Sequence, residues 1–398
     1  MNINEFSFEY VLANYSKDYP LLKRLEHTKQ DSLWHAEGNV AIHTELVIQA
    51  IKEAISNDPQ ISESDSKVLL WAAALHDYAK PITTKEREID GLVRIVSPKH
   101  EDIGASLLFT RTKPNDLTDK EWLLVIKLIG FHQQAKLLVV RDKGASDYLK
   151  LFREVKSLDL LYHLALADLI GRDCEDKQEQ IDLIELFKLE YIDLGYTGFY
   201  EDYVRMSTSS FKDQCGEKAE RVALMGIREL SNGDIFMLEE ALSKPYGYES
   251  IPIVNITVGI SGAGKSSYVS TQNLPVVSMD QIRETLVDIH TQKVNDKVMR
   301  IAHEQLRQHL RDKNEIIWDA TNYRKDFRSK VTQLAYKYGA FVRFIVFMKD
   351  EKQLQIDNAS RKKEVPAIVI SKQCDKFEIP TESEAHQIVW VRQGEVIM

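Results

Sequence analysis

Cysteine is scarce in this 398-residue sequence, which contains only Cys174, Cys215 and Cys374. The three lie far apart and form no CxxC pair, which argues against a disulfide framework and a thiolate zinc site and favours a reducing compartment. No apolar run approaches the length of a membrane span, and MNINEFSFEY lacks the basic and apolar segments of a signal peptide. We therefore expect a cytoplasmic protein that does not act at a membrane.

Low-complexity segments and fixed-period repeats are absent as well, and the rest of the composition is that of a globular protein. Hydrophobic residues make up 43% and charged residues 28% of a chain long enough for two or three domains. The net charge of −9 is unevenly distributed along the chain. Residues 251–398 contain 22 Lys and Arg and 18 Asp and Glu, a net charge of +4, so residues 1–250 carry −13. This asymmetry indicates two modules with different partners, and neither is basic enough to identify nucleic acid by charge alone.

The hydrophobic pattern changes near residue 250. Before it, apolar residues recur at the three- and four-residue spacing of helices, except where Asp90-Gly91 in EIDGLVRI predicts a small hairpin. SKPYGYESIP, at 243–252, indicates a linker, and after it short apolar runs alternate with helical stretches, a pattern typical of a parallel sheet with crossovers. We therefore predict a multidomain chain with an all-α domain over 1–195, a helical connector over 196–250 and an α/β domain over 251–398.

One apolar run in the helical half is followed directly by two ionisable residues. VLLWAAAL, at 68–75, is followed directly by His76 and Asp77. Burying such groups costs several kcal/mol unless they are paired or bound to a metal. Other histidines and one inward-facing carboxylate complete the order H…HD…H…H…D, and the whole set is His43, His76, Asp77, His100, His132 and Asp168. Imidazoles and carboxylates without thiolates suit first-row divalent metals, and two metals sharing a carboxylate could polarise a phosphate and supply a hydroxide to attack it.

Two cations accompany this set. Lys80 follows His76 by four residues and Arg172 follows Asp168 by four, so each lies on the same helical face as a proposed ligand. Either could hold a phosphate oxygen, or could simply be a salt-bridge partner. We therefore regard both as candidate catalytic residues.

This arrangement resembles the HD-domain phosphohydrolases over roughly residues 30–175. The resemblance implies one or two divalent metals such as Mn²⁺, Ni²⁺, Zn²⁺, Cu²⁺ or Co²⁺. It implies that Asp77 bridges two metals, with the other five members of the set completing their shells. His35, in HAEG before the His43 helix, could be a metal ligand, a substrate contact or a donor to a ligand.

The second half opens with a phosphate-binding motif. GISGAGKS, from Gly259 to Ser266, matches GxxxxGK[ST] between an apolar strand and a helix. Backbone N–H groups and the helix N-terminus would face the phosphates, Lys265 would reach the β- and γ-phosphates, and Ser266 would bind Mg²⁺. We expect ATP or another NTP, held by Gly259, Ser261, Gly262, Ala263, Gly264, Lys265, Ser266 and Ser267.

Candidate groups for the phosphate acceptor follow at the ends of later strands. Asp280 ends a predicted strand, where a carboxylate can take the proton of an attacking hydroxyl, and Arg283 could bind a substrate phosphate. Asp319 ends another strand and could act on Mg²⁺ or near the substrate. Further candidate substrate contacts are Asn322, Arg324 and Arg328.

A basic cluster follows near the end of the chain, in NASRKKEVP at 358–366. It indicates a lid whose Arg361 could stabilise charge on the transferring phosphoryl group. The alternative is an ordinary solvated helix face.

These elements look like those of the P-loop polynucleotide 5′-kinase family over about 251–398, and the whole chain resembles the bacterial HD-Pnk end-healing enzymes. The resemblance implies phosphorylation of 5′-OH ends and removal of 3′-phosphate, 2′-phosphate or 2′,3′-cyclic phosphate, on DNA or RNA, before a polynucleotide ligase acts. Two alternatives stay open. The charge of −13 over residues 1–250 favours a nucleotide phosphohydrolase fused to a nucleoside-type small-molecule kinase. The other is a nucleotide-gated regulatory protein with slow turnover.

Overall fold

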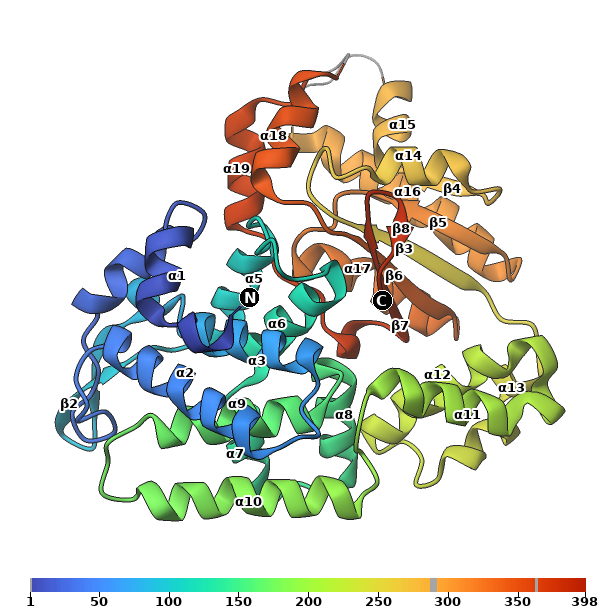
Figure 1. The fold of residues 1–398 in the computed structure, drawn as a ribbon. Coiled ribbons are helices and arrows are strands. Elements are labelled where there is room, and N and C mark those ends of the chain that lie inside the picture. The colour runs from blue at the N-terminus through green and yellow to red at the C-terminus, as the bar shows by residue number, and fades with distance from the viewer. Residues whose placement is uncertain (1, 287–291, 362–363) are drawn as a thin grey trace. The chain divides into compact units, whose positions relative to one another are not determined.

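The chain divides into two compact units, Met1–Tyr203 and Val204–Met398 (Figure 1). The structure, a computed structural model, describes residues 2–286, 292–361 and 364–398, with only the backbone of 292–295. The sequence predicted a separate connector over 196–250. Most of that segment, from Val204 onward, groups with the second unit.

In the described residues of the first unit, the elements are helices apart from one hairpin, as predicted. Its helices are η1 (Ile3–Glu5), α1 (Phe8–Tyr15), η2 (Pro20–His27), α2 (Val40–Asn57), α3 (Glu63–Leu75), α4 (Lys80–Thr83), α5 (His100–Phe109), α6 (Asp119–Phe131), α7 (Gln134–Val140), α8 (Ala145–Val155), α9 (Leu158–Ile170) and α10 (Lys177–Asp193).

Helix α3 lies at the centre of this unit. It packs against α2, α6 and α9, and every residue from Val68 to Lys80 is buried. A helix surrounded on all sides needs apolar residues all round, which is why VLLWAAAL shows no polar face. Ser62 caps its N-terminus by accepting a hydrogen bond from the Asp65 amide. The C-terminal end of α3 therefore delivers His76 and Asp77 into the interior of the unit.

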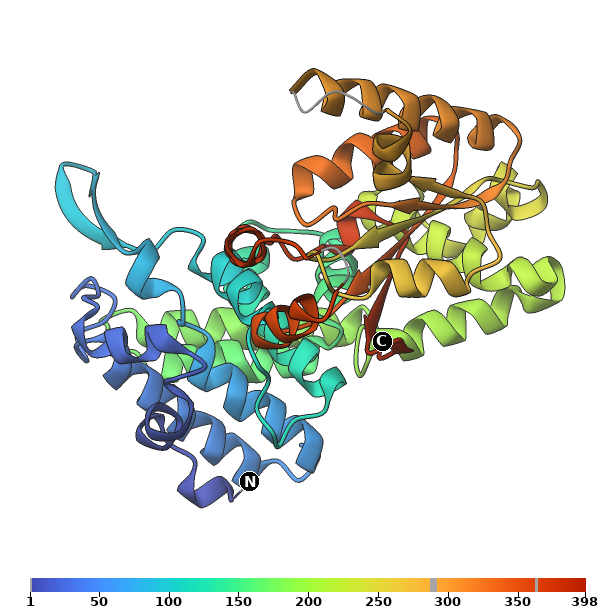
Figure 2. The same ribbon diagram turned by 90° about the horizontal axis from the view of Figure 1, so that it is seen from above.

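The predicted hairpin is confirmed. β1 (Lys85–Ile89) pairs antiparallel with β2 (Leu92–Val96) around Asp90 and Gly91, whose φ angles are 51° and 77°. Two consecutive residues with positive φ make the turn that matches strand twist, and Asp-Gly is a favoured pair for it. The hairpin projects from the helical unit (Figure 2).

One helical stretch, Asp119–Val140, is long and apolar enough by length and composition to cross a membrane. Its mean hydropathy is 1.5 over an 18-residue window, and 61% of that window is buried within the protein. The sequence expectation, that no run approaches a membrane span, overlooked this stretch because isolated charged residues interrupt it. Its burial is that of a core helix.

The second unit is an α/β fold with a mostly parallel sheet, as predicted. Its strands are β3 (Ile253–Val258), β4 (Val276–Ser278), β5 (Glu315–Asp319), β6 (Phe341–Phe347), β7 (Gln387–Arg392) and β8 (Glu395–Val396). They lie in the order β4-β5-β3-β6-β7-β8, and only the β7–β8 pairing is antiparallel. Strand β3 is thus central, and the loop that follows it opens at the carboxyl edge of the sheet.

Helices cover both sides of this sheet. In Figure 2, α16 and α17 lie on one side and α14 on the other. The helices from β3 onward are α14 (Lys265–Thr271), α15 (Met279–Thr285), α16 (Gln292–Arg311), α17 (Lys325–Lys337), α18 (Glu351–Ala359), α19 (Ala367–Asp375) and η5 (Glu382–Glu384).

A small helical layer precedes the sheet. It consists of α11 (Tyr200–Cys215), which spans the boundary between the units, η3 (Gly216–Lys218), α12 (Ala219–Asn232), η4 (Leu238–Ser243) and α13 (Pro245–Tyr248). Its apolar residues form one cluster with Phe341 of β6, so this layer belongs to the core of the second unit. Gly226 permits the close packing of α12 on η4, because a Cβ there would lie 2.6 Å from that of Ala241. The segment expected to be a linker at 243–252 therefore includes a short helical turn.

Candidate active sites

Three histidines of the first unit are oriented by the same backbone contact. In each, Nδ1 lies 2.8 Å from the carbonyl oxygen of the residue three positions earlier. The pairs are His76 with Ala73, His100 with Ser97, and His132 with Ile129. A carbonyl can only accept, so Nδ1 carries the proton and Nε2 keeps its lone pair. Metal-binding histidines are typically oriented through their other ring nitrogen in this way.

The ligand atoms form two groups that share Asp77. His43, His76 and Asp77 make one group and Asp77, His100 and His132 the other, with the ligand atoms of each group within 4.8 Å of one another. Asp77 Oδ2 lies 3.2 Å from His76 Nε2, and its Oδ1 lies 3.2 Å from His100 Nε2. One carboxylate oxygen therefore faces each group, the arrangement needed for a bridging ligand.

The donor atoms of this cluster fit a cation. The Nε2 atoms of His43 and His76 are 3.4 Å apart, and those of His100 and His132 are 3.3 Å apart. With Nδ1 protonated, facing Nε2 lone pairs repel each other unless a positive charge lies between them. Asp168 Oδ1 also lies 2.9 Å from His43 Nε2. The predicted set of four histidines and two carboxylates is thus assembled in one place and can hold divalent metal.

Titration behaviour agrees with this chemistry. Burial raises the pKa of Asp77, but His76 and Lys80 outweigh it and hold that pKa well below its usual value. Burial lowers the pKa of His43, yet Asp168 and Glu37 raise it overall. Burial beside His100 and His76 lowers the pKa of His132 to about 3, so this imidazole stays neutral.

Both candidate cations contact the carboxylates of the cluster. Lys80 Nζ lies 2.7 Å from Asp77 Oδ2 and donates to Gln30 Oε1 at 2.8 Å. Arg172 Nη2 donates to Asp168 Oδ2 at 2.5 Å. Since both also line the pocket beside the cluster, they can balance the carboxylates and still face an anion entering that pocket.

His35 does not belong to the two groups around Asp77. Its Nδ1 lies 2.7 Å from Glu37 Oε1, and the same oxygen lies 3.0 Å from His43 Nδ1. Glu37 therefore orients His43, a role that the sequence analysis missed although HAEG contains the residue. His35, Glu37 and His43 also form a third group of possible ligands. Burial lowers the pKa of His35 to about 4.

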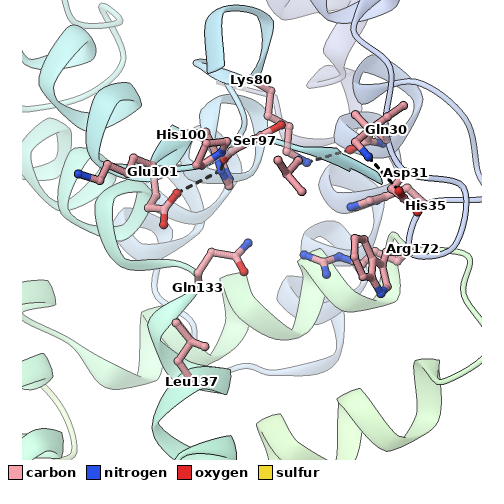
Figure 3. Close-up of a pocket in the computed structure, with 15 residues that line it drawn as sticks. Gln30, Asp31, His35, Lys80, Ser97, His100, Glu101, Gln133, Leu137 and Arg172 are labelled. Atoms are coloured by element: carbon pink, nitrogen blue, oxygen red, sulfur yellow. Dashed lines mark hydrogen bonds and ion pairs between the residues drawn. The ribbon is translucent and has the colours of Figure 1, made fainter. Parts of the chain in front are cut away.

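A pocket of about 350 Å³ opens beside the cluster. Lys80, Arg172, His35 and His100 line it, and Figure 3 shows Gln133 and Arg172 pointing into its centre. Positive and amide side chains around a metal-binding cluster suit an anionic substrate such as a phosphate ester.

The P-loop of the second unit lies where the motif predicts, between β3 and α14. Gly262 and Gly264 have φ angles of 91° and 99°, a conformation that side chains disfavour. Lys265 Nζ donates to the carbonyl oxygens of Gly259 and Ile260, both at 2.8 Å, and burial lowers its pKa to about 8. Lys265 is thus held inside the loop that would receive the phosphates.

The other residues predicted to bind the nucleotide lie in the P-loop or in the first turn of the helix that follows it. Ser266 and Ser267 are exposed in the first turn of α14. The Ser261 amide donates to Gln373 Oε1 of α19 at 2.9 Å, a contact that the sequence analysis did not anticipate. Ala263 lies beside Gly259, whose added Cβ would be 3.5 Å from the Ala263 Cβ.

Arg361 also comes to the P-loop. A Cβ added to Gly262 would lie 3.9 Å from Arg361 Nη1, so the guanidinium is next to the phosphate-binding loop. The lid hypothesis depends on the whole basic cluster at 358–366, of which Lys362 and Lys363 lie outside the described residues.

Two carboxylates lie at the carboxyl edge of the sheet. Asp319, at the end of β5, accepts hydrogen bonds from Thr257 at 3.3 Å and Ser278 at 3.4 Å, and burial raises its pKa. Asp280, in the first turn of α15, has an 88% exposed side chain paired with Arg283 at 2.6 Å. Both carboxylates interact electrostatically with Lys265. Asp280 is therefore accessible to an acceptor at the edge where the P-loop lies.

Two predicted substrate contacts have other roles. Arg328 is fully buried and pairs with both carboxylate oxygens of Glu384, at 2.8 and 2.9 Å. Asn322 is buried too, with φ of 48°, and its Nδ2 donates to Thr257 O at 2.8 Å. These contacts hold the framework of the unit and correct the assignment of both residues to the substrate surface. Arg324 is partly exposed and pairs with Asp326 at 3.0 Å.

Comparison with known proteins identifies both halves. Residues 40–161 match the HD domain family and residues 254–380 match the AAA domain family. A solved structure of a candidate kinase from Chloroflexus aurantiacus shares 14% identity over 36% of this chain and 87% of its own, with a TM-score of 0.31, too distant to carry a functional argument. No curated protein matches significantly. The chain therefore combines a match to the HD domain family, with a His/Asp cluster suited to metal, and a C-terminal match to the AAA domain family that contains the P-loop.

Proposed function

We propose that this protein heals nucleic-acid ends. The C-terminal domain would phosphorylate 5′-OH ends with ATP or another NTP, and the HD domain would remove 3′-phosphate, 2′-phosphate or 2′,3′-cyclic phosphate. The observation that carries the proposal is the pairing of a two-group His/Asp cluster with a P-loop whose sheet edge presents Asp280. The products, 5′-phosphate and 3′-OH ends, are substrates for a polynucleotide ligase, and we propose that the enzyme acts in the cytoplasm.

The HD pocket would act on the phosphate through its cations and its ligand cluster. Bound metal would polarise the phosphate and supply a hydroxide at neutral pH. Lys80 and Arg172 would orient the phosphate oxygens, because both line the pocket beside the cluster. Asp77 and Asp168 stay ionised, since neighbouring positive groups hold the pKa of each well below its usual value despite burial.

The kinase site would work by positioning and charge. The P-loop amides, Lys265 and Arg361 would surround the phosphates, with Mg²⁺ on Ser266. Asp280 would accept the proton of the 5′-OH. Arg283, which forms an ion pair with Asp280, would leave that pair and bind a substrate phosphate.

A short single-stranded oligonucleotide with 5′-OH and 3′-phosphate ends tests the proposal. It is incubated with ATP and Mg²⁺, with and without Mn²⁺, Ni²⁺ or Zn²⁺, and both ends are resolved by mass. We expect a gain of 5′-phosphate and a metal-dependent loss of 3′-phosphate. Asp280→Ala should lose the first activity and keep the second. An unchanged kinase in this variant would contradict the assigned base.

The second candidate function is a nucleotide phosphohydrolase fused to a nucleoside-type kinase. The acidic balance of residues 1–250 favours it, because such a surface repels a long polyanion. Consumption of ATP or free nucleotides, with neither oligonucleotide end altered, would support this alternative.

A further inference from the structure

The wall of the HD pocket contains an aromatic side chain that the phosphate chemistry does not require. Trp34 lines the pocket and is partly exposed. The Arg94 guanidinium lies 5.7 Å from the centroid of its ring. An aromatic ring paired with arginine is the kind of surface on which proteins stack single-stranded bases.

The loop that carries Trp34 is anchored by buried Asp31. Its carboxylate accepts hydrogen bonds from the Ile95 amide at 3.0 Å and the Leu33 amide at 3.1 Å, and pairs with Arg94 at 3.3 Å. The Trp34 amide donates to Asp31 O at 3.1 Å. Asp31 thus joins this loop to the end of β2 and fixes the ring and the guanidinium together. Such bracing indicates a preformed binding surface.

The position of Trp34 relates it directly to the phosphate site. The next residue, His35, contacts His43, with ring centroids 4.9 Å apart. Trp34 and His35 also line the same pocket as His100, a member of the cluster, so the ring belongs to the wall of the site that would receive the phosphate. The pocket of about 350 Å³ is at the lower end of small-molecule sites, which suits one nucleotide unit and not a length of strand.

We propose that Trp34, with Arg94, forms a stacking platform for the base of the nucleotide whose 3′- or 2′-phosphate enters the HD site. The inference rests on the proposed phosphatase function and names its ligand class, a nucleoside 3′- or 2′-phosphate. A strand end and a free mononucleotide share this chemistry. The platform binds the base, so it selects nucleotides over phosphate esters that lack one.

The test compares metal-loaded wild type, Trp34→Ala and Trp34→Phe on three substrates: a 3′-phosphorylated oligonucleotide, a nucleoside 3′-monophosphate and glycerol 2-phosphate. Leu33→Ala is the matched control, because Leu33 is an exposed neighbour in the same loop. We expect Trp34→Ala to raise KM for both base-bearing substrates roughly 10- to 100-fold, the range expected for one lost stacked base. Activity on glycerol 2-phosphate should not change, and Trp34→Phe should restore most of the loss.

Each other outcome has a distinct meaning. Equal losses on all three substrates, or no loss on any, would overturn the platform. Trp34-dependent cleavage of the mononucleotide without cleavage of the oligonucleotide would keep the platform and contradict end healing. If the oligonucleotide is cleaved with the same KM by wild type and Trp34→Ala, end healing would be supported and the platform contradicted. Failure of the wild type on both base-bearing substrates would contradict both.

Discussion

Burial distinguishes Arg283 from Arg328, although the sequence predicted both to be substrate contacts. Arg283 is about half exposed at the sheet edge and pairs with an exposed carboxylate, whereas Arg328 is fully buried against Glu384 and also donates to two backbone carbonyls. Breaking a buried pair leaves a charge without compensation, while an exposed pair contributes little. The first arginine is thus free to serve a substrate and the second holds the fold.

This contrast predicts opposite effects of substitution. Arg328→Met should lower the free energy of unfolding by about 3–5 kcal/mol, because it removes the buried partner of the Glu384 carboxylate, whose side chain is only 8% exposed. Arg283→Met should leave stability within about 0.5 kcal/mol and raise KM for a 5′-OH oligonucleotide. Denaturant unfolding and kinase assays measure the two effects. A stable Arg328→Met protein with a raised KM would restore the original assignment of Arg328 to the substrate.

Lys265 gives a pH-dependent prediction. Burial lowers its pKa from 10.5 to about 8, so at pH 7 its charge in the nucleotide-free protein costs on the order of 3 kcal/mol. The unfolded chain binds the extra proton between about pH 8 and 10.5, so this cost disappears as the pH rises through that window.

Lys265→Met should therefore be more stable than wild type at pH 7 without nucleotide, and this advantage should shrink towards pH 10. It should also lose kinase activity. Thermal unfolding of the two proteins across this range checks the prediction, with Lys337→Met, at an exposed lysine of α17, as the control. A constant difference in Tm at all pH values would contradict it.

At the scale of elements, the hairpin forms part of the HD pocket. The end of β2 supplies Ile95 and Val96 to the pocket wall, and its amide at Ile95 holds Asp31. The turn depends on Gly91, whose φ of 77° disfavours any side chain although nothing lies within 4 Å of an added Cβ. The conformation of the turn at Gly91 therefore affects the position of β2, whose end forms part of the pocket wall.

Gly91→Val should therefore impair the phosphatase and leave the kinase unchanged. The left-handed conformation costs a non-glycine residue roughly 1–2 kcal/mol, which should loosen the pocket wall and raise KM for a 3′-phosphate substrate. Gly195→Val is the matched control, because Gly195 has a similar φ of 74°, equal space and no place in the pocket. Equal effects of both substitutions on KM would show that general destabilisation, not the pocket wall, is responsible.

At the scale of the whole molecule, the candidate residues of each proposed site come from a single unit. The His/Asp cluster and its cations lie before residue 203, and the P-loop with Asp280 and Arg361 lies after 204. Neither set of residues includes a member from the other unit. The two proposed activities should therefore be separable by substitution.

A mixture of two variants, each lacking one of the two proposed activities, tests this separation. Asp77→Asn should lose the phosphatase and bound metal but keep the kinase, and Lys265→Met should do the reverse. Mixed together, they should process both ends of one oligonucleotide, as mass analysis would show. Loss of kinase activity in the Asp77→Asn protein alone would contradict separability.

The sequence by itself determined the fold classes, the hairpin, the P-loop and the members of the buried His/Asp cluster. These follow from local rules: periodicity, Asp-Gly turn chemistry, and the glycine spacing that a phosphate loop requires. A charged pair at the end of the all-apolar α3 indicated a site, because burial of such groups needs compensation.

Only the tertiary structure decided which of those residues meet and which do not. It assembled two ligand groups around Asp77 from α2, α5 and the ends of α3 and α6. It also placed Asp168 of α9 beside His43 and added Glu37 as a partner of His43. It buried Arg328 and Asn322, grouped the segment from Val204 with the sheet, and set Trp34 beside the cluster. These outcomes depend on contacts between residues far apart in the chain, and a side chain's partners, unlike its periodicity, are not encoded by its sequence neighbours.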